Sequence, residues 1–157
     1  MFQRLYQVQE VTQETKEIAT ASKVAAIVAT LTTPTLALSE LDYCALPAAS
    51  KAKLVGYVQG FCLPISAAWQ VDDASVPIAA TRLVIASVFP ENPASFLKLL
   101  GGMLVDSEAF SSGIDAGRRE GELYRATGRR GTALLHILAS DFRAFCNYSK
   151  FAADVPG

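Results

Sequence analysis

The sequence predicts an all-α protein, a single-domain helical bundle of five to seven helices in which glycine-striped helices are close-packed. Sustained alternation of apolar and polar residues is missing, and so is an Asn-Gly hairpin signal, which argues against strands. With 157 residues, of which 51% are hydrophobic and 18% charged, the chain is long enough for one buried core. We therefore expect residues 1–157 to form one domain.

A strip of glycines is the strongest indication of how the helices pack. Gly113, Gly117 and Gly121 follow one another at four-residue intervals, so on a helix they share one face. Each interior glycine costs roughly 1 kcal/mol relative to alanine, and close packing of another backbone would offset that cost. Three apolar residues extend the same side of the helix: Phe110, Ile114 and Tyr124. The strip predicts that another helix lies directly against it.

The predicted partner is a second helix over residues 48–70. It is apolar on nearly all sides, as expected for a helix at the centre of a bundle. Gly56 and Gly60 repeat the four-residue spacing, and Pro64 continues the same register. Because proline cannot donate a backbone hydrogen bond, Pro64 should kink or divide this helix and free the carbonyl of Gly60. Together, Gly56, Gly60 and the later glycine strip form the predicted helix-packing surface.

The N-terminal segment, residues 1–32, is rich in helix-forming residues, either as one helix or as two with a break near residues 20–22. Pro34 predicts the end of this segment, because proline disfavours the α conformation at the residue before it. Residues 33–47 then form a connection, with a short helical turn over residues 39–43 that Ser39 can cap.

The rest of the helical core, residues 48–148, contains several further helix signals. Ser75 with Pro77 marks the start of a helix over residues 75–89, with Ile78 and Leu83 among the side chains available for burial. Asn92 followed by proline marks another helix over residues 93–104.

The glycine-striped helix begins near residues 106–107, and Gly128 should end it in a left-handed conformation. A last helix is expected over residues 131–148, with a tail over residues 149–157.

Three cysteines, Cys44, Cys62 and Cys146, show no short C-x-x-C pairing, which is typical of reduced core thiols in a cytoplasmic protein. The alternative is an exported protein in which residues 1–39 are a cleaved signal and Cys44 pairs with Cys62. An apolar run over residues 24–38 supports export, whereas the long, acidic segment before that run opposes it. We expect no transmembrane segment; residues 54–71 come closest, but their Gln, Gly and Pro dilute the hydrophobicity.

The residues that commonly carry chemistry are few. His136 is the only histidine, and no cluster has the spacing of a metal site, so we predict no catalytic residues, no metal and no cofactor. Asp72 and Asp73, with Asp42 and Glu40, can form an acidic patch, although adjacent carboxylates before a helix more often belong to a turn. His136 is expected to be structural or exposed.

An arginine group is the most suggestive charge feature. Five arginines fall within a short stretch whose local charge is offset by two glutamates: Arg118, Arg119, Arg125, Arg129 and Arg130. Guanidinium groups here can bind an anion, RNA or an acidic partner protein. Net charge is −1 overall, so nucleic-acid binding would depend on this local group alone.

By elimination, the sequence predicts a non-enzymatic protein-binding module: an adaptor, chaperone, inhibitor or immunity-like accessory protein of bacterial type. Its partner would be another protein or a second copy of the chain. The alternative is a nucleic-acid-binding regulator that uses residues 118–130.

Overall fold

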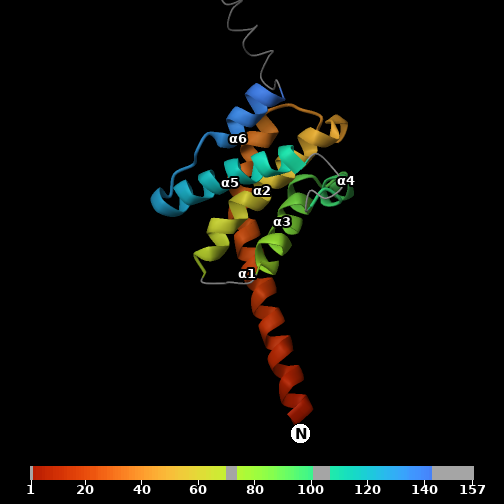
Figure 1. The fold of residues 1–157 in the computed structure, drawn as a ribbon, viewed down its shortest axis with the longest axis vertical. Helices are drawn as coiled ribbons and strands as arrows, with labels where there is room; N and C mark the ends of the chain where they lie inside the picture. The colour runs from red at the N-terminus through yellow and green to blue at the C-terminus, as the bar shows by residue number, and fades with distance from the viewer. Residues whose placement is uncertain (1, 70–73, 101–106, 143–157) are drawn as a thin grey trace, which may run out of the picture.

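The computed structural model describes residues 2–69, 74–100 and 107–142, and within these ranges the protein is entirely helical, as predicted. The elements in chain order are α1 (Phe2–Leu38), η1 (Tyr43–Ala45), α2 (Ala48–Ala67), α3 (Ser75–Val88), α4 (Pro93–Leu97), α5 (Ser107–Thr127), α6 (Ala133–His136) and the π-helical turn η2 (Ile137–Asp141). They pack into one bundle in which α5 crosses α2 and α3 lies beside α1 (Figure 1).

The largest interface between elements is formed by α2 and α5, and its centre is made of glycine. A Cβ atom built on Gly113 would collide with the carbonyl oxygen of Lys53, and one on Gly117 with the carbonyl oxygen of Tyr57. The relation is reciprocal, because a Cβ on Gly60 would collide with the carbonyl oxygen of Ile114. Each built Cβ atom would lie less than 3.0 Å from the carbonyl oxygen named, a separation that real Cβ atoms essentially never show. The predicted packing of the two glycine strips is confirmed.

The second major contact joins α1 to α3. The part of α1 after residue 20 inserts small and β-branched side chains into the core, while its N-terminal half projects beyond the rest of the bundle (Figure 1). The buried residues of α1 are Ala21, Val24, Ala25, Val28, Thr32 and Leu36. The hydroxyl of the buried Thr32 has a hydrogen-bond partner, because its Oγ1 donates to the carbonyl of Val28 at 2.8 Å. A break over residues 20–22 does not occur.

The predicted end of the first helix at residue 32 is wrong, because α1 continues through Pro34 to Leu38. Because proline has no backbone N–H, the carbonyl one turn earlier in the helix loses its hydrogen-bond donor. Side chains from elsewhere donate hydrogen bonds to neighbouring carbonyls: Arg130 Nη2 to Leu31 and Tyr43 Oη to Leu36. These tertiary contacts stabilise a helix end that local sequence rules do not favour.

The connection between α1 and α2 is held by aromatic packing. Phe89, at the end of α3, stacks on Phe96 of α4 with ring centroids 4.1 Å apart, and Tyr43 packs on Phe89 at 5.2 Å. The short helical turn is η1, later than the predicted residues 39–43, and the carboxylate of Asp42 caps it by accepting from Cys44 N. Ser39 instead donates to the carbonyl of Leu36.

Other predicted boundaries agree with the structure, differ from it or lie outside it. Gly128 ends α5 with φ of +66°, as expected for a left-handed C′ residue, and its N–H donates to Tyr124 O at 2.7 Å. Pro64 lies inside α2, which is not divided. The helix predicted over residues 93–104 is shorter, because α4 ends at Leu97 and residues 98–100 form a turn. The helix predicted over residues 131–148 begins at Ala133, and its predicted end falls outside the described residues. Ile78 and Leu83, which were expected in the core, are partly exposed, and so are Trp69 and Leu135.

Among the described residues, one helical stretch is long and apolar enough to cross a membrane, Glu14–Leu38 in α1, and 33% of it is buried in the bundle. A core helix and an N-terminal signal sequence share these properties. The stretch lies in α1 and not over residues 54–71, which are in and just after the central helix α2.

Candidate functional site

The candidate site is built around a buried carboxylate on α5. Glu120 is only 7% exposed, and its Oε2 accepts a hydrogen bond from Leu134 N at 3.3 Å. The backbone of Ala133 also donates to this carboxylate. Thr132, at the N-cap of α6, makes no side-chain capping bond. Glu120 therefore replaces the missing local cap and holds the start of α6 against α5.

Tyr57 on α2 completes the environment of this carboxylate. Its hydroxyl donates to Glu120, and burial, followed by the nearby Glu120 charge, raises the pKa of Tyr57 well above its ordinary value. Tyr57 therefore remains a neutral donor. Arg130 lies close enough for its positive charge to favour the ionised form of Glu120, and its Nη2 also donates to Leu31 O and Thr35 Oγ1 of α1. Arg130 thus links the α5–α6 loop to the end of α1.

A cavity of about 360 Å³ opens beside this network, and we call it the leucine pocket. Its wall combines four leucines with the polar network: Leu31, Thr35, Leu38, Tyr57, Glu120, Arg130, Gly131, Leu134 and Leu135. Leu38 is 72% exposed and Leu135 46%. Leu123, 43% exposed, lies next to Gly131. The leucine pocket is therefore an apolar hollow with exposed leucines at its rim and a charged group at its base.

The arginines singled out by the sequence line different cavities or none. All five are exposed, but Arg130 lines the leucine pocket and Arg119 lines a different cavity. Arg118, Arg125 and Arg129 line neither. Arg118 and Arg119 are adjacent on α5 and therefore point in different directions, whereas the cavities they could line depend on other helices that the spacing does not reveal.

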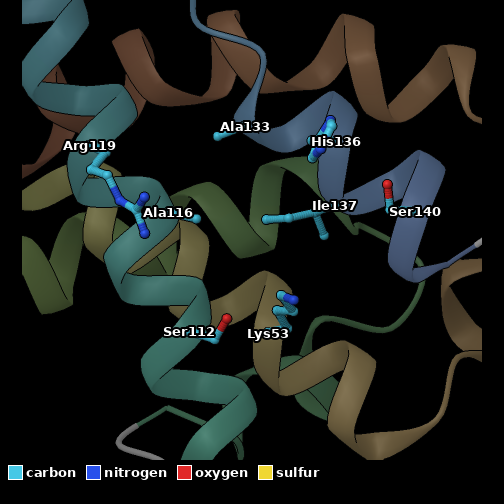
Figure 2. Close-up of a pocket in the computed structure, with 8 residues that line it drawn as sticks. All are labelled: Lys53, Ser112, Ala116, Arg119, Ala133, His136, Ile137 and Ser140. Atoms are coloured by element: carbon cyan, nitrogen blue, oxygen red, sulfur yellow. The ribbon is translucent and has the colours of Figure 1, made fainter.

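The second cavity, which we call the basic pocket, has a volume of about 270 Å³ and lies between α2, α5 and the last helix (Figure 2). Its lining residues are Lys53, Ser112, Ala116, Arg119, Ala133, His136, Ile137 and Ser140. His136 was expected to be structural or exposed; it is exposed, and it also faces this cavity. The sequence did not indicate the basic pocket, because its polar residues come from separate helices.

The remaining candidate residues stay apart. Cys44 is exposed and Cys62 buried, both as free thiols, so the alternative Cys44–Cys62 bridge is not formed. Burial raises the pKa of Cys62 to about 12, which keeps it protonated. Of the acidic patch, Asp42 caps η1, while Asp72 and Asp73 fall outside the described residues, as does Cys146.

Comparisons with protein-family models, with curated proteins and with solved structures find no match to this chain. Its function is therefore argued from its own geometry.

The buried carboxylate predicts a pH dependence of stability. Burial raises the pKa of Glu120 above its ordinary value, although Tyr57, the backbone of Leu134 and Ala133, and the charge of Arg130 act in the opposite direction. A raised folded-state pKa means that the folded protein binds the proton more tightly than the unfolded chain does. The resulting stabilisation is complete below the unfolded-state pKa of about 4.3 and is lost as the pH rises through the folded-state pKa.

Glu120→Gln removes this titration with little change in shape. We expect the unfolding free energy of the wild type, minus that of Glu120→Gln, to decrease as the pH rises from about 4 towards neutrality. Urea unfolding of both proteins across the same pH series measures the difference. An increase with pH would mean that the pKa of Glu120 is lowered in the folded state.

Proposed function

We propose that the protein is a binding module that recognises another protein through the leucine pocket. The observation that carries this proposal is the pair of exposed leucines, Leu38 and Leu135, at the rim of one cavity. Covering a leucine side chain stabilises a complex by about 1.5–3 kcal/mol, and exposed apolar residues around a hollow are typical of protein interaction sites.

The polar groups of the pocket suggest what the partner presents. An apolar side chain can enter the cavity, while Arg130 at its edge can pair with a carboxylate or backbone carbonyl of the partner. Glu120 and Tyr57 already satisfy each other at the base, so burying them further under a partner leaves no new unpaired donor. The expected partner element is a short amphipathic helix or extended segment with an apolar anchor and a nearby acidic residue.

The division of the arginines favours a protein partner over nucleic acid. A nucleic-acid footprint needs several cations along one surface, usually with aromatic side chains between them. Here Arg119 and Arg130 line separate cavities, and within the described residues each cavity has a single aromatic ring, His136 in one and the buried Tyr57 in the other. A second copy of the chain belongs to the same class of partner as another protein.

Substitution at the rim tests the proposal. Cross-linking in the native cell followed by mass spectrometry identifies the partner of the wild type, and the affinity of the purified partner is then measured. We expect the double variant Leu38→Asp with Leu135→Asp to lose binding to this partner. The matched control is Leu83→Asp on α3, a leucine that is 44% exposed and does not line the leucine pocket. Light scattering on the purified chain shows whether the partner is a second copy.

The expected loss is about tenfold or more in affinity for the rim variant, with the control binding as the wild type does. Equal affinity of the rim variant and the wild type would contradict the proposal, as would equal losses in the rim variant and the control.

A further inference from the structure

The basic pocket is a second place where the fold gathers polar groups, and it is separate from the leucine pocket. We propose that it binds the phosphate group of a small phosphate monoester. Figure 2 shows Arg119 and Ser112 on α5, Lys53 on α2, and His136 with Ser140 on the opposite wall. Side chains from three parts of the chain thus face one cavity.

The charge of the lining favours an anion. Lys53 contributes an ammonium group, Arg119 a guanidinium group and His136 an imidazole ring, and no carboxylate lines the basic pocket within the described residues. Ser112 and Ser140 add hydroxyls that can donate to anionic oxygens. A set of guanidinium, ammonium and hydroxyl donors around one cavity is the chemistry that proteins use for phosphate.

The fold holds these groups in place. The close contact of Gly113 with the carbonyl of Lys53 fixes the Lys53 backbone beside Ser112, whatever the Lys53 side chain does. Nε of Arg119 donates to Asp115 O at 3.4 Å, a contact within α5 that leaves Arg119 among the residues lining the cavity. The opposite wall follows the start of α6, which Glu120 holds through Ala133 and Leu134.

Local helix geometry also points to this wall. After His136 the chain continues as the π-helical turn η2, which carries Ile137 and Ser140. Short π-helical turns are rare and are frequently found at functional sites.

The size and lining of the pocket define the ligand class. A volume of about 270 Å³ can hold a phosphate group with a small organic portion, which Ala116, Ala133 and Ile137 can cover on the apolar side. Among the described lining residues, the imidazole of His136 is the only aromatic ring, and a volume of about 270 Å³ leaves little room for a nucleobase beside a sugar phosphate. The pocket therefore fits a small aliphatic or sugar phosphate better than a nucleotide or a nucleic-acid strand.

Titration of the full chain with inorganic phosphate and with glycerol 3-phosphate tests this proposal. Calorimetry and amide chemical shifts follow binding at constant ionic strength set with chloride. We expect saturable binding of both, tighter for the monoester, and a loss of about tenfold or more in Arg119→Gln. Lys53→Gln should show a similar loss, because the substitution leaves the Lys53 carbonyl against Gly113.

The matched control is Arg118→Gln, the adjacent exposed arginine, which does not line the basic pocket and should bind as the wild type does. Thermal unfolding shows that each variant remains folded. If Arg118→Gln and Arg119→Gln weakened phosphate binding equally, the effect would come from the overall charge of the protein, and the proposal would be overturned. Non-saturable binding by the wild type, or binding only to vesicles that contain phosphatidic acid, would overturn it as well.

Discussion

Gly117→Ala should destabilise the protein by about 3 kcal/mol or more, although alanine is the better helix former. The added Cβ would lie 2.8 Å from Phe61 N and closer still to Tyr57 O, both backbone atoms of α2. Neither can move aside without separating the two helices, so the clash affects the whole α2–α5 interface. Urea unfolding monitored by circular dichroism measures the loss.

The control for this substitution is Ser111→Ala, at an exposed position of the same helix. Its effect should be within about 0.5 kcal/mol, as for most exposed positions. Gly117→Ala would contradict the packing if it stabilised the protein by the helix-propensity difference alone.

Glu120→Ala should destabilise the protein by about 2–4 kcal/mol, because it removes the acceptor of several buried donors at once. Leu134 N and the hydroxyl of Tyr57 would both lose their bond to the carboxylate. The effect should be strongest in α6, where Leu134 N–H should exchange with solvent faster than in the wild type. Amide hydrogen exchange, together with urea unfolding, measures both consequences.

Glu122→Ala is the matched control, since Glu122 is an exposed glutamate two residues away on α5. It should change stability by less than about 0.5 kcal/mol and leave exchange at α6 unaltered. If Glu120→Ala behaved in the same way, Glu120 would not be the group that caps α6. Because Glu120 also positions one wall of the basic pocket, its alanine variant should weaken phosphate binding while the α2–α5 contact remains.

The glycine packing could be predicted from sequence because it depends on spacing alone. Gly113, Gly117 and Gly121 have no plausible role in a helix unless another backbone approaches, and Gly56 with Gly60 offered the matching surface. Local conformational rules also identified the end of α5, where Gly128 adopts a positive φ.

The errors came from tertiary contacts that local rules do not contain. Pro34 indicated a helix end, but α1 continues past it. Arg130, far along the chain, donates a hydrogen bond to the carbonyl of Leu31, and Tyr43, just after the helix, donates one to the carbonyl of Leu36. Such partners are known only once the fold is known.

Glu120 is one of the two glutamates that offset the arginine group in the sequence, and helical spacing does carry a signal of its burial. Glu120 follows Gly117 by three residues and precedes Tyr124 by four, so helical spacing places it on the buried side of α5. The two pockets carried no comparable signal, because each takes residues from several helices.

The central claim is that the backbones of α2 and α5 touch where the glycines replace side chains. The most direct measurement is the nuclear Overhauser effect between the Hα protons of Gly117 and the backbone protons of Tyr57 and Phe61, in a sample labelled at glycine. The account predicts strong cross-peaks at Gly113 and Gly117, where the built Cβ atoms meet α2 backbone. Spectra in which these glycine protons show contacts only within α5 would contradict it.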